Sequence, residues 1–347
     1  MSPRGWTRPT SGPGARHALK HVAAPVDTTL GMGSRRSTSS ALALASLAAF
    51  LLLALIDAAP GLARTTSRAA ATAPSCGGET LPAKPTGGRW ACTFDDEFSA
   101  ATGDASALNT SWWVPQVTAT SAFTTGPAGA EACYVNSTNN ISVSTGALHL
   151  TARKEPAPFT CGWFTTQYTA GMVSTYTNFS QTYGRFEVRA RLPQTVAAGL
   201  QETLWLWPIN DTLYGAWPGS GEVDFSEFYS QYSNLDVPYI HYSYDASTVN
   251  AATHTNTVTA YTCQISLSQY NAYAVVWTPG SFTITINGKS CLVDSYLANG
   301  GLTSPAPFNQ PFFVALTQAL GIGTNAFNPA TTPLPATTSV DYVRVWK

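Results

Sequence analysis

Short stretches of alternating apolar and polar residues recur along the chain beyond residue 89. In residues 184–193 every second residue is apolar, and charged residues such as Glu187 and Arg189 lie between them. This period of two is typical of a half-buried β-strand. The same alternation marks three further ranges: 273–277, 281–286 and 339–346. Asn287-Gly288 follows the second of these, and this dipeptide is a strong signal for a hairpin turn.

The pattern as a whole predicts an all-β fold. No long stretch has helical periodicity and no segment repeats, whereas short strands are separated by frequent turn formers. These features favour a jelly-roll sandwich of two antiparallel sheets across residues 89–347. Residues 64–88, rich in Ala, Thr, Ser and Pro, have little apolar surface to bury and are expected to form a flexible lead-in.

One apolar run differs from the strands. Residues 41–56 are almost entirely Ala, Leu, Phe and Ile, follow Arg35-Arg36 and end near the small residues 61–63. This arrangement predicts that residues 1–63 are a signal peptide, removed on export, and that the protein is secreted with no membrane segment. A single uncleaved anchor is the alternative. Met32 is a second candidate for the start of translation.

The charge balance limits the partners. Residues 1–63 hold six of the 18 Lys and Arg and two of the 19 Asp and Glu, so the remainder carries a formal charge of −5. A mildly acidic chain without basic runs is a poor candidate for binding nucleic acid or an anionic membrane. We also expect a monomer.

All six cysteines lie beyond the predicted cleavage point, which favours disulfides in an exported chain. Fifteen pairings are possible. Proximity in the sequence favours Cys76–Cys92, Cys133–Cys161 and Cys263–Cys291. With no Cys-x-x-Cys motif and scattered histidines, a zinc site is not expected.

The strongest chemical signal is the segment Glu-Val-Asp-Phe-Ser-Glu at residues 222–227. It places three carboxylates in six positions of a chain with 11% charged residues, between Trp217 and Tyr229. Packing gives no reason to collect acids that repel one another. Aromatic faces beside clustered carboxylates suit a site that binds sugar rings and hydrolyses the bond between them.

A strand with one bulge brings the acids together. Val223 and Phe225 favour a strand, on which Glu222 and Asp224 share a face. Strict alternation would turn Glu227 to the other face, but a bulge near residues 225–226 restores it. The two glutamates then lie with α-carbons about 13 Å apart, and side chains leaning inward leave about 5–6 Å between their carboxyl groups. This separation predicts retaining hydrolysis.

In such a pair, one glutamate attacks as the anion and the other holds a proton for the leaving oxygen. Asp224 lies between them and can help to separate their pKa values. The alternatives are a solvated acidic edge strand and a calcium loop. An edge strand favours Lys, and a calcium loop favours Asp, Asn and Gly at alternate positions, so we favour the catalytic interpretation.

With this motif the chain resembles glycoside hydrolase family 16, the laminarinase-like retaining β-glucanases. Glu222, Asp224 and Glu227 match the bulged Glu-x-Asp-x-x-Glu signature of that family. Four other segments resemble its opening segment, its central strand, the strand before the catalytic loop and its terminal strand: residues 94–98, 182–189, 204–208 and 340–346.

The resemblance implies a concanavalin A-like jelly roll with a concave substrate cleft. It also implies Glu222 as nucleophile, Glu227 as acid/base and Asp224 as their helper. The bulged signature points to laminarinases and their galactan-cleaving relatives. Two departures bear on substrate choice: Ala216 replaces a usual arginine, and Ser226 replaces a usual Ile or Met.

Several aromatic residues are candidates for sugar contacts. Trp217, beside the acidic segment, is expected to stack on a sugar ring. For Trp205 and Trp207, sugar binding and core packing are both open, as are binding and structural roles for His241, Tyr229 and Tyr232. The tryptophans expected to be structural are Trp112, Trp113, Trp163 and Trp277.

No cofactor is required for this chemistry. Some family members bind calcium on the convex side, and Glu97, Gly146 and Asp341 occupy comparable positions, so they form a candidate calcium set. The leading hypothesis is a secreted endo-acting β-1,3- or mixed-linkage β-1,3/1,4-glucanase with a polysaccharide substrate. A galactan-cleaving or transglycosylating relative and a non-catalytic glucan-binding module are the alternatives.

Overall fold

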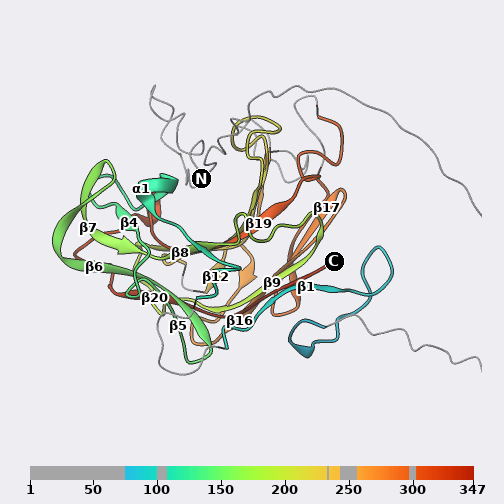
Figure 1. Ribbon diagram of the computed structural model, residues 1–347, viewed down its shortest axis with the longest axis horizontal. Coiled ribbons are helices and arrows are strands. Elements are labelled where there is room, and N and C mark those ends of the chain that lie inside the picture. The colour runs from blue at the N-terminus through green and yellow to red at the C-terminus, as the bar shows by residue number, and fades with distance from the viewer. Residues whose placement is uncertain (1–74, 100–107, 233, 243–255, 297–301) are drawn as a thin grey trace, which may run out of the picture. The chain divides into compact units, whose positions relative to one another are not determined.

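Two β-sheets pack face to face (Figure 1), as seen in a computed structural model that describes residues 75–99, 108–232, 234–242, 256–296 and 302–347. The predicted signal peptide and residues 64–74 of the predicted lead-in lie outside these ranges. The structure is all-β, as the alternation predicts. In the described ranges the helical elements are α1 (Thr118–Ser121) and short 3-10 turns at Cys76–Gly78 and Gly323–Asn325.

The first sheet runs in the order β18 (Lys289–Asp294), β17 (Ser281–Ile286), β16 (Asn271–Thr278), β9 (Gly184–Arg191), β20 (Ala336–Trp346), β6 (Ala147–Cys161), β7 (Phe164–Ala170), β4 (Ala132–Tyr134) and β3 (Thr124–Thr125). In addition, β1 (Cys92–Asp96) pairs with β20, and β5 (Ile141–Ser144) pairs with β6. Pairing is antiparallel throughout this sheet except between β4 and β7, which are parallel.

The second sheet runs in the order β14 (Asn256–Thr259), β13 (Tyr239–Tyr242), β11 (Glu222–Tyr229), β10 (Leu200–Pro208), β19 (Phe312–Leu320), β8 (Met172–Ser174) and β2 (Val114–Pro115). At one edge, β12 (Leu235–Asp236) pairs with β11 and with β15 (Cys263–Gln264). Its central strands β11, β10 and β19 carry the acidic segment and its neighbours.

The predicted strands are all present, as β9, β16, β17 and β20. Asn287 and Gly288 have φ angles of 51° and 74°, which is the left-handed pair that a tight hairpin needs. Alternation predicts that the charged residues of β9 are exposed to solvent, but Glu187 is not. Glu187 is buried because it accepts a 2.7 Å hydrogen bond from the hydroxyl of Tyr342 and pairs with Arg185.

The main core fills the space between the sheets. Leu204 and Leu206 of β10 meet Phe186 and Val188 of β9 in one apolar cluster. A second apolar cluster covers the opposite face of the second sheet and includes Trp205. Strand β10 is therefore buried on both faces, which explains the continuous apolar run at residues 204–208.

Polar side chains cross the core near one end of β10. Glu202 and Gln318 are cross-strand partners on the face that carries Leu204, and Gln318 donates a hydrogen bond to the Glu202 carboxyl. Thr338 of the first sheet donates to Gln318 Oε1 at 2.9 Å. Burial raises the pKa of Glu202 to about 8. Because an isolated buried carboxylate is costly, this carboxyl group is neutral at pH 7.

The three disulfides favoured by sequence proximity are confirmed: Cys76–Cys92, Cys133–Cys161 and Cys263–Cys291. The first fastens the end of the predicted lead-in to β1. Cys76 is fully buried, and nearby Glu79 pairs with Arg344 of β20 at 3.3 Å.

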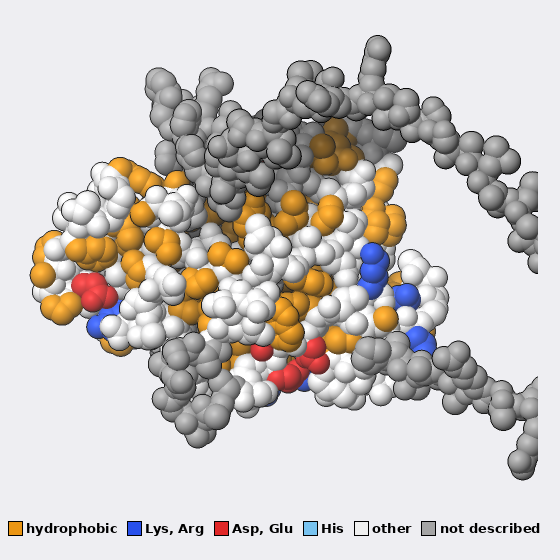
Figure 2. All heavy atoms as spheres, viewed as in Figure 1, with side chains coloured by type: hydrophobic (Ala, Val, Ile, Leu, Met, Phe, Trp, Pro, Cys, Tyr) orange, Lys and Arg blue, Asp and Glu red, His pale blue; other side chains and the backbone are white. Residues whose placement is uncertain are grey.

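Trp113 and Trp277 are buried as expected. Trp112 packs against Phe94 but is 36% exposed. Trp163 is 64% exposed at the turn between β6 and β7, so a structural role in the core is wrong for Trp163. Charged side chains are sparse on the face seen in Figure 2, in keeping with the composition. Within the described ranges, no helix is both long and apolar enough to cross a membrane.

Candidate active site

A bulge in β11 decides where the acidic side chains lie. Against β10, Leu204 pairs with Ser226 and Trp205 pairs with Asp224, so Phe225 is the extra residue. Phe225 is fully buried in the core between the sheets. Glu227 pairs with Thr203 and thereby returns to the face that carries Asp224. The predicted bulge is present, and Glu222, Asp224 and Glu227 share the face turned away from the core.

Glu222 and Asp224 each have a specific neighbour. The indole N–H of Trp217 donates to Glu222 Oε2. His241 Nε2 lies 3.3 Å from Asp224 Oδ2, and Glu222, Asp224 and His241 each offer an atom within 4.8 Å of the other two. An N–H donor favours the anionic form of a carboxyl group. Trp217 therefore gives Glu222 an N–H donor that an anionic carboxylate can use.

Glu227 lies in a different environment. It is only 4% exposed, and its pKa is raised well above the usual value by burial first and by the charge of Asp224 second. Hydrogen bonds from Gln201 and Tyr229 act in the opposite direction. Burial also raises the pKa of Asp224. The segment thus places a buried carboxyl that favours its proton a few residues from one that accepts an N–H bond.

Aromatic rings surround this segment. His241 stacks on Tyr239 with centroids 5.4 Å apart, and the ring of Trp217 lies 5.4 Å from His241. Burial lowers the pKa of His241, so the imidazole is neutral at pH 7. Tyr232 packs edge-on against Tyr261.

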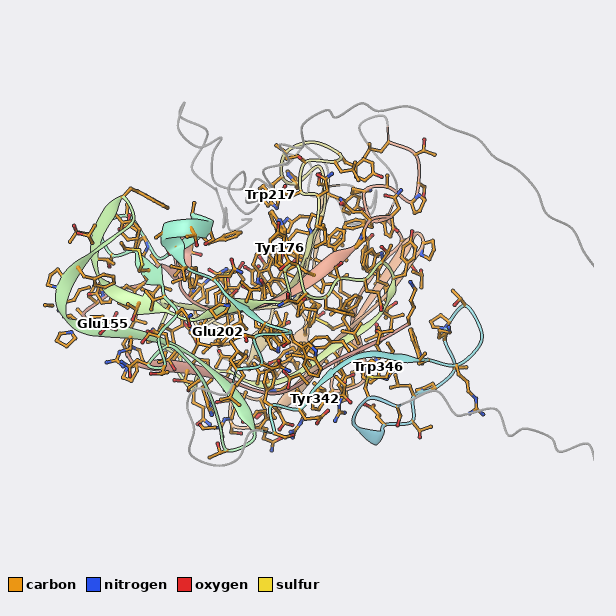
Figure 3. All side chains as sticks on the ribbon, viewed as in Figure 1. Glu155, Tyr176, Glu202, Trp217, Tyr342 and Trp346 are labelled. Carbon is orange, nitrogen blue, oxygen red and sulfur yellow. A yellow bond between two sulfur atoms is a disulfide. The ribbon has the colours of Figure 1, made fainter. Side chains whose placement is uncertain are left out.

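A pocket lies beside the acidic segment on the same face of the second sheet. Its walls include Phe123, Tyr176, Trp205, Trp207 and Asp211. Trp205 and Trp207 are buried at 7% and 3% exposure and pack in the second apolar cluster, so the structure favours packing over an open stacking platform for both. In Figure 3, Trp217 and Tyr176 lie higher in the view than Glu202.

Ser226 has a structural explanation. Its hydroxyl donates a 2.7 Å hydrogen bond to Asp236 Oδ1 inside the molecule, and burial raises the pKa of Asp236 to about 7. The serine that replaces the usual Ile or Met therefore has a hydrogen-bond partner in Asp236, a buried acid on β12.

Sequence reasoning missed Gln201 and Tyr239. Gln201 donates to Glu227, and Tyr239 stacks on His241. A signal for Gln201 was present, because Gln201, Thr203 and Trp205 alternate along β10. Using that signal needs the register of β10 against β11, which the bulge alters.

The sequence profile of glycosyl hydrolases family 16 matches residues 129–321, which is more than half of the chain. The chain belongs to glycosyl hydrolases family 16. The matched region contains β10, β11 and the whole acidic segment.

Relatives of this family 16 chain have different substrates in their names. It is 34% identical over 185 residues to the keratan-sulfate endo-1,4-beta-galactosidase of Sphingobacterium multivorum. The matched region covers 52% of this chain and 40% of that protein. It is 30% identical over 266 residues to glucan endo-1,3-beta-glucosidase A1 of Niallia circulans. The matched region covers 73% of this chain and 37% of that protein. The chain therefore spans less than half the length of either relative.

The fold of this family 16 chain also matches a solved laminarinase. The catalytic domain of an endo-1,3-beta-glucanase from Thermotoga petrophila RKU-1 superposes with a TM-score of 0.60. The match covers 74% of this chain and 98% of that domain at 22% identity. It shows the jelly-roll fold.

The candidate calcium set of this family 16 chain is otherwise engaged. Glu97 pairs with Arg344 at 2.7 Å, and Asp341 pairs with Arg189. Gly146 lies in the turn between β5 and β6. As these side chains lie they do not fit a cation, because a guanidinium group already neutralises each carboxylate. The calcium site stays a prediction from the sequence, and no step below depends on it.

Proposed function

We propose that the chain is a secreted retaining endo-glycosidase that hydrolyses β-1,3- or mixed β-1,3/1,4-glucan. The observation that carries this proposal is the bulge at Phe225, which puts Glu222 and Glu227 on one face in opposite electrostatic settings. Double displacement at a glycosidic bond requires one carboxyl group that attacks as an anion and one that holds a proton.

In the first step the Glu222 carboxylate attacks the anomeric carbon, and the bond to the leaving sugar breaks. Glu227 gives its proton to the leaving oxygen, so that the departing chain leaves as a neutral alcohol. The raised pKa of Glu227 supports this role because the group keeps its proton to a higher pH than an ordinary carboxyl group does.

In the second step Glu227, now ionised, takes a proton from water. The oxygen of that water attacks the anomeric carbon. The bond from the anomeric carbon to Glu222 breaks, and Glu222 is released as a carboxylate. Asp224 lies between the two and faces neutral His241. We assign Asp224 to coupling the two glutamates, since a negative charge on Asp224 raises the pKa of Glu227.

The substrate side of the proposal is supported by the relatives and by the rings around the acids. The Niallia circulans relative is named for β-1,3-glucan. Trp217 and Tyr229 are half-buried beside the carboxyl groups and offer apolar faces to a sugar. Because the Sphingobacterium multivorum relative is named for galactose linkages, galactan cleavage is the second candidate.

Digestion of a panel of polysaccharides tests this assignment. Laminarin, barley glucan, agarose, carrageenan, keratan sulfate and xyloglucan are each incubated with the protein, and product linkages are determined. We expect short oligosaccharides from laminarin or barley glucan. Products from galactose-containing polymers alone would transfer the assignment to the second candidate. Added acceptor oligosaccharides show whether transfer competes with hydrolysis.

Export is part of the proposal and has its own test. Residues 1–63 are proposed to be cleaved as a signal peptide. N-terminal sequencing of protein from culture medium should give a mature start near residue 64. Full-length protein retained in the cell membrane would contradict cleavage and favour the anchor.

A further inference from the structure

We propose that Gln201 is a positioning residue that holds the Glu227 carboxyl group and fixes which of its two oxygens carries the proton. This inference rests on the proposed function, in which Glu227 is the acid/base. Gln201 is fully buried on β10, where it pairs with Tyr229, and its Nε2 donates to Glu227 Oε1. The contact runs diagonally across the two strands.

Glu227 meets ionisable groups from three directions. Glu222, Asp224 and Tyr229 on β11 act on its pKa. Glu227 in turn raises the pKa of Tyr239 on β13 and of Tyr261 before β15. All of these are acids that change charge or share a proton. Gln201 is different because its amide stays a donor at every pH at which the protein folds. It therefore gives Glu227 one fixed partner.

A fixed donor settles the geometry of the proton. An amide N–H takes a lone pair of Glu227 Oε1, and the neutral carboxyl group then carries its hydrogen on Oε2. Oε2 is thus the oxygen that gives the proton to the leaving group and later receives one from water. Without the amide, the carboxyl group can rotate or place its proton on the oxygen that faces β10, and the proton is less often aligned for transfer.

The hydrogen bonding of Gln201 is one-sided. Among the described residues, its Oε1 has no partner although it is buried. Gln318, which binds Glu202 in the core, uses both ends of its amide because its Oε1 accepts from Thr338. Buried amides that serve packing are normally satisfied at both ends. The contact with Glu227 is therefore the feature that places Gln201.

The test compares Gln201→Met with Gln318→Met in the full chain. Each variant replaces a buried amide that donates to a buried glutamate by a side chain of similar length without hydrogen bonds. Kinetics are measured from pH 4 to pH 10 on laminarin and on a 2,4-dinitrophenyl β-glycoside, which needs little acid assistance. Thermal unfolding of both variants is recorded.

For Gln201→Met we expect kcat/KM on laminarin to fall about tenfold or more, the scale of a lost hydrogen bond to a charged group. The loss on the dinitrophenyl glycoside should be smaller. A donor stabilises the carboxylate, so its removal raises the pKa of Glu227, and the alkaline limb of the pH profile should move to higher pH. Gln318→Met should unfold at a lower temperature but keep the wild-type limb.

Equal losses on both substrates with an unmoved limb in Gln201→Met would overturn the proposal and leave Gln201 a packing residue. If Gln201→Met does not fold, Gln201→Glu replaces it. A second carboxyl against Glu227 should also move the alkaline limb to higher pH, and an unchanged limb overturns the proposal. The proposed function fails separately, if the limb persists in Glu227→Ala or if wild-type protein cleaves no polysaccharide of the panel.

Discussion

Two buried glutamine–glutamate pairs lie on opposite faces of the second sheet. Gln201 donates to Glu227 on the face with the acidic segment, and Gln318 donates to Glu202 in the core between the sheets. Burial raises the pKa of both glutamates, to about 8 for Glu202 and well above the usual value for Glu227. Local chemistry alone does not distinguish them.

The neighbours do distinguish them. Besides burial, only the bond from Gln318 shifts the pKa of Glu202. The pKa of Glu227 responds to Asp224, Glu222 and Tyr229 as well. A raised pKa is therefore a consequence of burial in both places, and a catalytic assignment needs the second carboxylate on the same face. The comparison predicts that changes on the face that carries the acidic segment affect turnover and that changes in the core affect stability.

The largest effect is expected for Glu222→Gln, on the face that carries the acidic segment. Removal of the nucleophile should lower turnover of glucan about 10⁴-fold or more. Glucan binding, measured by affinity electrophoresis, should persist because Trp217 and the surrounding rings remain. More than a few per cent of residual turnover would refute the nucleophile assignment.

Glu227→Ala should be the next largest. Loss of the general acid should lower turnover of laminarin by about 10²–10⁴-fold. Aryl glycosides with good leaving groups should lose much less, since they depart without a proton. Rates on the two substrates, compared in one preparation, check this. Equal losses would move the acid role to another residue.

In the core, Glu202→Gln should change how stability depends on pH. The pKa of Glu202 is about 8 when folded against an ordinary 4.5, so between these values the folded chain keeps a proton that the unfolded chain has lost. Stability therefore falls as pH rises through this window. The variant should remove up to about 1.4 kcal/mol per pH unit from that slope. Urea unfolding at pH 5 to 8 measures it.

Asp236, with a folded-state pKa of about 7, should leave a residual slope below that pH in the Glu202→Gln variant. A slope identical to that of the wild type would show that Glu202 is ionised in the folded protein. Activity at pH 6 should be unchanged, because Glu202 faces away from the acidic segment.

The smallest effect is expected for Thr338→Val. It removes the donor to Gln318 Oε1 and leaves that oxygen buried without its 2.9 Å hydrogen bond. Such a loss costs about 1–3 kcal/mol of stability. Denaturant unfolding should show it, with kcat/KM on laminarin unchanged. A pH profile altered as in Gln201→Met would instead mean that the hydrogen bonds of Thr338 and Gln318 affect the acidic segment on the opposite face.

The alternation of residues predicted the all-β class and four strands of the first sheet. Period two marked β9, β16, β17 and β20, and the Asn287-Gly288 turn was readable because few dipeptides adopt its backbone angles. The bulge was inferred because Glu227 has no other way to reach the face of Asp224. Sequence proximity also gave the three disulfides.

Long-range pairings were beyond the sequence. The contact of Gln201 with Glu227 depends on the register of two strands whose residues are 26 positions apart. The hydrogen bonds around Glu202 extend through Gln318 to Thr338 of the other sheet. Trp163 was misjudged because its exposure depends on its place at a hairpin tip. Alternation shows which face a side chain takes, but not what covers that face.

The most direct test of double displacement is the anomeric configuration of the first product. Laminarin is digested in deuterated buffer, and proton NMR follows the reducing-end signals before mutarotation. We predict that the β-anomer appears first and the α-anomer grows in later. Initial release of the α-anomer would show inversion, and would contradict attack by Glu222 with Glu227 as acid.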